Sequence, residues 1–123
     1  MAVIGIGIDV VDIERFRTSL ERTPTMRVRL FTASELEYVA DKSDPVPSLA
    51  ARFAAREAVM KSMGLGLGAF GFHEVWVERA TTGVPSLVVT GRAADLAADR
   101  GITRWHLSLT HSDLVAAAYV VAE

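Results

Sequence analysis

The chain has no cysteine among its 123 residues, which excludes disulfide bonds, thiolate catalysis and cysteine-based metal sites. It has three histidines, and no two of them stand at metal-ligand spacing. No apolar run is long enough to span a membrane. The first residues, MAVIGIGIDV, lack the basic start and the long apolar core of a signal peptide. We therefore expect a cytoplasmic protein that binds no membrane.

The chain also lacks an excess of positive charge, because its formal net charge is −2, which argues against general nucleic-acid binding. The charges are unevenly distributed. Two interpretations fit a basic stretch within residues 15–29: a solvated helix face, or a docking surface for an acidic partner. The arginines of that stretch are Arg15, Arg17, Arg22, Arg27 and Arg29.

Length and composition set the scale of the fold. A chain of 123 residues fits one domain, over residues 1–123. Half of the residues are hydrophobic, and the mean hydropathy is +0.28. Because this is rich for a small monomer, we expect part of the apolar surface to be buried between subunits.

The order of hydrophobic patterns predicts an α+β fold with a mostly antiparallel sheet packed by helices. A strand comes first, followed by three helices, a hairpin, a short helix and a second hairpin. The strand is expected over 3–9, the helices over 12–22, 30–40 and 48–63, the hairpins over 73–91 and 105–122, and the short helix over 93–101.

The first strand, VIGIGID, alternates between large and absent side chains. Ile4, Ile6 and Ile8 point to one side of such a strand, and Gly5, Gly7 and Asp9 to the other. Another backbone or a ligand can approach the glycine side closely, because no side chains shield it. Asp9 stands at the end of this open face.

The central helix, SLAARFAAREAVMKSMG, carries four charges within RFAAREAVMK. A helical turn of about 100° per residue places Glu57 and Lys61 beside the large apolar Phe53. The simplest interpretation is a surface ion pair between Glu57 and Lys61, worth only about 0.3–0.5 kcal/mol. The alternative is a functional site, because a carboxylate that borders apolar residues is either paired with a cation or takes part in binding or catalysis.

Three neighbouring features favour a site. Asp9 adds a second carboxylate, and Lys61 lies at the helix end that meets the glycine-rich loop GLGLGAFG. Mg²⁺ takes one or two carboxylates together with substrate phosphates, so this set predicts a Mg²⁺–polyphosphate site. By itself the loop is weak evidence for a phosphate site. It follows a helix, and a helix C-cap with a flexible connection gives the same glycine-rich pattern.

Five segments, in this order, resemble the bacterial holo-[acyl-carrier-protein] synthases, which are the short phosphopantetheinyl transferases. The most specific motifs are the early G-I-D and the helix motif F-x-x-K/R-E-A-x-x-K. The resemblance covers nearly the whole chain. The segments are GIGIDVVDIERF (5–16), LFTASELEYV (30–39), RFAAREAVMKSMGLGLG (52–68), GVPSLVV (83–89) and SLTHSDLVAAAYVV (108–121).

The resemblance implies transfer of 4′-phosphopantetheine from coenzyme A to a serine of apo acyl carrier protein, which leaves adenosine 3′,5′-bisphosphate. It also implies a homotrimer with coenzyme A in clefts between subunits. Asp9 and Glu57 would hold Mg²⁺ and, with Lys61, carry the catalysis, and Glu57 would be the general base. Arg15 and Arg22 would dock the acidic carrier. The coenzyme A contacts would be Arg52, Lys61, Gly64, Gly66, Gly68, Pro85 and His111.

Some roles stay open at this point. The family commonly has lysine where this chain has Arg56, and arginine keeps the charge but cannot donate a proton in catalysis. Arg52 serves either the phosphates or the fold, and a lone histidine such as His111 is often only a solvent-facing residue. Two other functions are a non-catalytic coenzyme A or nucleotide-binding regulatory module and a purely structural oligomeric domain.

Overall fold

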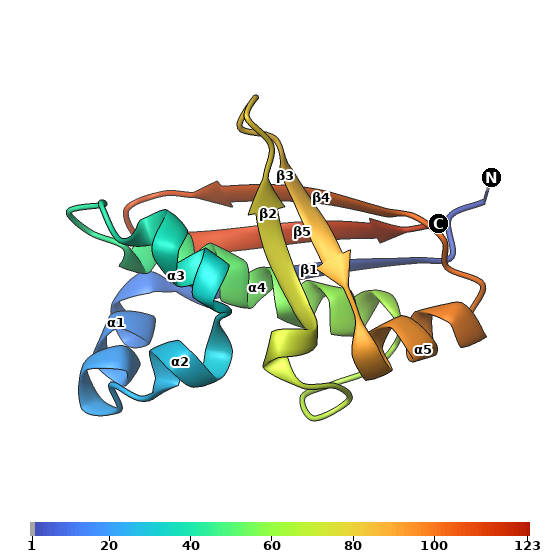
Figure 1. Ribbon diagram of the computed structural model, residues 1–123, viewed down its shortest axis with the longest axis horizontal. Coiled ribbons are helices and arrows are strands. Elements are labelled where there is room, and N and C mark those ends of the chain that lie inside the picture. The colour runs from blue at the N-terminus through green and yellow to red at the C-terminus, as the bar shows by residue number, and fades with distance from the viewer. Residues whose placement is uncertain (1) are drawn as a thin grey trace.

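A computed structural model describes residues 2–123 of the chain (Figure 1). Three strands form one antiparallel sheet, and two form a separate hairpin. The strands are β1 Gly5–Asp12, β2 Val75–Arg79, β3 Pro85–Val89, β4 Trp105–His111 and β5 Val115–Ala122. The helices are α1 Ile13–Arg22, α2 Met26–Leu30, α3 Ala33–Val39, α4 Val46–Ser62, the 3-10 turn η1 Phe72–Glu74 and α5 Gly91–Asp99.

Helix α4 is the centre of the molecule. It lies along the β1-β5-β4 sheet, while the β2–β3 hairpin crosses in front of it and α1, α2 and α3 gather at one end (Figure 1). Alanine lines much of its length, and Ala54, Ala55 and Ala58 are fully buried. Small side chains allow strands to approach the helix on several sides, which explains why α4 is buried nearly all round.

The glycines of β1 permit the closest of these approaches. A Cβ at Gly5 would overlap the carbonyl oxygen of Ser62, and one at Gly7 would overlap that of Ala58. The open glycine face of the strand is therefore filled by the backbone of α4. Asp9, two residues further along the same face, reaches the flank of this helix.

The other face of β1 is exposed and apolar. Ile6, Ile8 and Val10 are more than half exposed, at 57%, 55% and 58%. Tyr119 of β5 pairs with Ile8 and is also exposed. The sheet thus presents an apolar outer face that no part of residues 2–123 covers.

The sequence predicted most of these elements correctly. The side chain of Asp12 caps α1 by accepting a hydrogen bond from the Arg15 amide at 2.9 Å. Thr32 and Glu35 form the capping box that starts α3. The short helix α2 was missed, because five residues give little periodicity and Thr25 offers no side-chain cap.

The α+β class and the antiparallel sheet are confirmed. Helix α4 begins at Val46, two residues before the expected start, and ends at Ser62. Within residues 2–123, no helix has the length and apolarity that a membrane crossing requires.

Candidate active site

Asp9, Glu57 and Lys61 meet where β1 passes α4. The ammonium of Lys61 donates to Asp9 Oδ1 at 3.0 Å and to the carbonyl of Ile8 at 3.0 Å. The proposed surface pair between Glu57 and Lys61 is therefore wrong: Lys61 pairs with Asp9, and within residues 2–123 Glu57 forms no ion pair.

Glu57 lies in an unusual electrostatic environment. Its Oε1 is buried and has no hydrogen-bond partner among the described residues. Burial raises the pKa of Glu57 above its ordinary value of 4.5, the charge of Asp9 raises it further, and Lys61 opposes both. A carboxylate with an unfilled acceptor beside a second carboxylate attracts either a proton or a cation.

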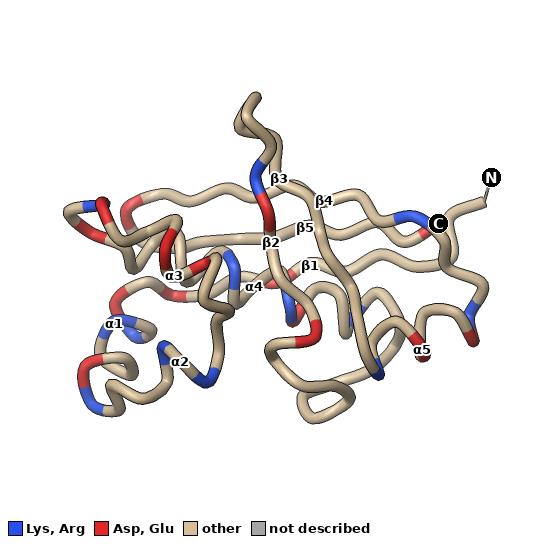
Figure 2. Tube along the Cα trace, viewed as in Figure 1, with Lys and Arg blue, Asp and Glu red and all other residues tan. Residues whose placement is uncertain are grey.

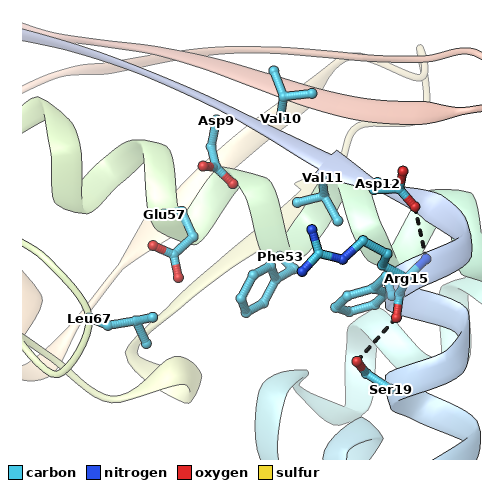
Figure 3. A pocket seen from close by; sticks show the side chains of 10 residues that line it. Asp9, Val10, Val11, Asp12, Arg15, Ser19, Phe53, Glu57 and Leu67 are labelled. Carbon is cyan, nitrogen blue, oxygen red and sulfur yellow. Dashed lines mark hydrogen bonds between the residues drawn. The ribbon is translucent and has the colours of Figure 1, made fainter.

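These carboxylates open into a cavity of about 400 Å³. Figure 3 shows Asp9 and Glu57 on one wall, Phe53 on the floor, and Arg15 and Leu67 at opposite ends. The wall is acidic, the floor is apolar, and one end is basic. The complete lining is Asp9, Val10, Val11, Asp12, Arg15, Phe16, Ser19, Phe53, Glu57 and Leu67.

The donor set fits a metal that shares its ligands with a substrate. Residues 2–123 hold no cluster of three or more His, Asp or Glu side chains placed to bind a metal by themselves. Asp9 and Glu57 supply two carboxylates, and the buried Oε1 of Glu57 has no partner within residues 2–123. Mg²⁺ needs only one or two carboxylates when phosphate oxygens and water complete its octahedron.

Arg56, whose role the sequence left open, belongs to the core and not to this cavity. Its side chain and that of Glu35 are both 0% exposed and form a bidentate ion pair. Arg56 also donates to the carbonyls of Phe72, at 2.7 Å, and Arg52, at 3.2 Å, while Glu35 accepts the Val77 amide at 3.1 Å. This pair joins α3, α4, η1 and β2, so Arg56 has a structural role.

Arg52 and His111 meet in a second cavity, of about 140 Å³, that Asp9 and Glu57 do not line. Arg52 is 2% exposed, and its guanidinium lies 4.5 Å from the ring centre of Tyr38. It donates to the Ser48 carbonyl at 3.2 Å, yet its Nε has no partner within the described chain. Burial lowers the pKa of Arg52.

Two further cations surround the same tyrosine. Lys42 Nζ lies 5.3 Å from the ring centre of Tyr38, and the guanidinium of Arg79 lies 5.7 Å from it. We call Lys42, Arg52, Arg79 and His111 the basic cluster; all four line the second cavity. Sequence reasoning missed Lys42 and Arg79, because one stands in a loop and the other in a strand, outside the motif segments. Pro85 pairs with Arg79 across the hairpin, which puts it beside this cluster.

The arginines of the basic stretch divide into two groups. Arg15 and Arg22 are exposed and line a groove on α1 with Glu14, Thr18 and Ser19. Arg17 instead forms a two-bond ion pair with Asp44, at 2.9 and 2.8 Å. Figure 2 shows basic residues gathered on α1 and α2 at one end of the molecule.

The glycine-rich loop follows α4. Gly64 and Gly68 have positive φ angles of 72° and 91°, and Gly66 faces open space. The loop reaches the carboxylate cavity through Leu67, not through a glycine.

The chain matches known proteins along nearly its whole length. Residues 5–121 match the family model of the 4′-phosphopantetheinyl transferase superfamily. A holo-[acyl-carrier-protein] synthase of Streptomyces avermitilis is 51% identical over 124 residues, which cover 100% of this chain and 99% of that relative.

Solved structures agree. The crystal structure of the synthase from Neisseria meningitidis has a TM-score of 0.89 and 31% identity, with 99% of each chain covered. That from Helicobacter pylori, in complex with coenzyme A, has a TM-score of 0.82 and 26% identity, with 96% of this chain and 99% of that one covered. The chain therefore belongs to the 4′-phosphopantetheinyl transferase superfamily and is an enzyme of the holo-[acyl-carrier-protein] synthase type.

Proposed function

We propose that the protein transfers 4′-phosphopantetheine from coenzyme A to a serine hydroxyl of apo acyl carrier protein. The observation that carries this proposal is the paired carboxylates Asp9 and Glu57 in an open cavity of a chain of this family. We propose fatty acid biosynthesis as the pathway that this carrier serves.

In the reaction, the serine oxygen forms a bond to the phosphorus that carries pantetheine. The bond from that phosphorus to the bridging oxygen breaks, and adenosine 3′,5′-bisphosphate leaves with the electron pair. The serine proton goes to Glu57, whose buried Oε1 accepts no hydrogen bond from residues 2–123. Lys61, half exposed beside Asp9, neutralises charge on the phosphates.

Asp9 and Glu57 are the residues that would hold Mg²⁺. When bound, the ion supplies charge neutralisation at the pyrophosphate. The unpartnered Oε1 of Glu57 supports this assignment, since a buried acceptor without a donor is costly to leave empty.

The basic cluster is proposed to bind the phosphates of the nucleotide half of coenzyme A. Arg52 has an unpaired, desolvated Nε, and His111 and Lys42 stand at the same cavity. Such groups favour a multiply charged anion. Gly64, Gly66 and Gly68 are proposed to lie along the path of the pyrophosphate and pantetheine, and Pro85 to flank the nucleotide.

The two cavities support active sites between subunits, and the resemblance to the family is the basis for proposing a homotrimer. Arg52 and Glu57 are five residues apart on α4, which turns their side chains about 140° from each other. The carboxylates and the basic cluster of one chain therefore face different directions. One coenzyme A molecule that contacts a carboxylate pair and a basic cluster is expected to take them from two copies of the chain. The exposed apolar face of Ile6, Ile8 and Val10 offers the contact surface.

Arg15 and Arg22 are proposed to dock the acidic carrier. Both are exposed on α1, and Arg15 also stands at the end of the carboxylate cavity. A carrier bound along α1 would bring its serine to that cavity. The cytoplasmic location and the single-domain organisation expected from the sequence stay predictions.

Intact mass spectrometry tests the function. We expect an apo carrier protein incubated with this protein, coenzyme A and Mg²⁺ to gain the mass of one phosphopantetheine. Reactions without Mg²⁺ or with Glu57→Gln are the controls and should show no gain. Binding of coenzyme A without any mass gain would instead support a non-catalytic binding module.

A further inference from the structure

Leu67 is an exposed apolar residue with a defined place in the carboxylate cavity. Its side chain is among the most exposed large hydrophobics, at 68%, yet it forms one end of the cavity that contains Glu57 (Figure 3). Burial of a leucine side chain is favourable, and an exposed Leu67 does not gain this free energy. A ligand that covers Leu67 would recover that free energy.

The loop that carries Leu67 is tied to the body of the protein on both sides. The Leu65 amide donates to the Met60 carbonyl at 2.9 Å, which fixes the loop to the end of α4. The Ala69 carbonyl accepts from Arg92 Nε at 3.0 Å, which fixes it to α5. Leu67 is therefore presented to the cavity by an anchored loop.

Charge divides the surroundings of the cavity. Arg15 and Ser19 occupy the α1 end, where the acidic carrier is proposed to dock. Asp9 and Glu57 occupy the wall, and the basic cluster that suits the nucleotide lies in the other cavity. Most of the remaining lining is apolar, and Leu67 is its most exposed large hydrophobic residue.

The transferred group has one strongly apolar feature close to its phosphorus. In coenzyme A, one oxygen and one CH₂ separate this phosphorus from the pantoyl carbon that bears two methyl groups. With the phosphorus at Asp9 and Glu57, these methyl groups must lie within the same cavity. In an in-line displacement the nucleotide leaves opposite the attacking serine oxygen, and the pantetheine ester oxygen lies between these two positions, so the methyl groups lie beside the phosphorus.

We propose that Leu67 contacts the two pantoyl methyl groups of the donor and so determines which phosphoester the enzyme transfers. Phe53, on the cavity floor, completes the apolar surface. This inference rests on the proposed function, because that function places the phosphorus. It assigns Leu67 to recognition of the donor, whereas Arg15 recognises the acceptor.

A comparison of two donors and two enzymes tests the contact. The donors are coenzyme A and an analogue with hydrogens in place of both pantoyl methyl groups. We expect Leu67→Ala to lower kcat/KM for coenzyme A about tenfold, as loss of apolar contact does in a binding pocket, but by less than about twofold for the analogue. The KM for the carrier should not change. Leu67→Met, which keeps the apolar volume, should retain most of the activity.

Leu114→Ala is the matched control, because Leu114 is equally exposed, at 72%, and lines neither cavity. It should behave as the wild type with both donors. An equal loss for both donors in Leu67→Ala, or a loss confined to the KM of the carrier, would overturn the contact. Absence of transfer by the wild type would refute the proposed function itself, which is a distinguishable result. Thermal melting shows whether each variant is folded.

Discussion

Two charged groups on α4, one residue apart, have opposite surroundings. Arg56 is fully buried and every nitrogen of its guanidinium donates: to Glu35, to Phe72 and to Arg52. Glu57 is half-buried, faces a cavity, and leaves Oε1 unpartnered within the described chain. A network with all partners present holds a fold together, whereas an incomplete one has capacity left for a ligand.

The comparison also gives Arg56 a role that the sequence left open. Arg56 uses its planar fork to reach both oxygens of Glu35. A role in proton transfer is not needed at this position. Four predictions test this contrast between the buried ion pair and the open site, and they are given from the largest expected effect to the smallest.

Removal of the Glu57 charge should have the largest effect on activity. We expect Glu57→Gln, and likewise Asp9→Asn, to lower kcat by about 10³-fold or more, as loss of transition-state charge stabilisation does. The protein should stay folded. Steady-state kinetics and circular dichroism measure both; Glu37→Gln, an exposed change on α3, is the control. Normal turnover in either variant would refute the metal-site assignment.

Removal of the Arg56 charge should have the largest effect on stability. Arg56→Met leaves Glu35 charged and unpaired in the core, which should cost about 3–5 kcal/mol in the free energy of unfolding. Urea denaturation measures this. Glu57→Gln serves as the comparison and should not show such a loss. A fully stable Arg56→Met would contradict the structural role of the pair.

Carrier docking should respond more moderately. We expect Arg15→Gln to raise the KM for the carrier about tenfold and to reduce its dependence on salt, since rim charges steer association. Arg104→Gln, an exposed arginine outside the two cavities, should leave this KM unchanged. A carrier KM that salt does not affect in the wild type would argue against docking by charge.

The smallest effect is on stability as a function of pH. The pKa of Glu57 is raised in the folded state, so ionised Glu57 opposes folding at neutral pH. As pH falls through the folded pKa, the folded protein binds the proton first, and this cost disappears by the ordinary value of 4.5. Glu57→Gln should therefore be slightly more stable than wild type at pH 7, and the difference should vanish at pH 4. Melting curves without Mg²⁺ measure it, and an advantage that grows on acidification would contradict the burial of Glu57.

Local patterns in the sequence were enough to predict most of the elements and part of the site. Asp12 and Thr32 start helices through contacts within a few residues, so their roles are readable from spacing. The alternation of β1 predicted a close approach on the glycine side, which the backbone of α4 makes. Asp9, Glu57 and Lys61 were expected together, and the structure brings them together, though with Lys61 on Asp9 and not on Glu57.

Only the tertiary structure decided the roles of groups whose partners are distant in sequence. Glu35 and Arg56 are 21 residues apart, and their pairing depends on how α3 packs against α4. Lys42, Arg79 and His111 meet around Arg52 from three separate segments. The sequence by itself determined which residues carry charge, which segments are helices and strands, and which family motifs are present. The packing decided which charges are satisfied and which remain available, because the desolvation and pairing that set their energies arise from contacts that no local pattern encodes.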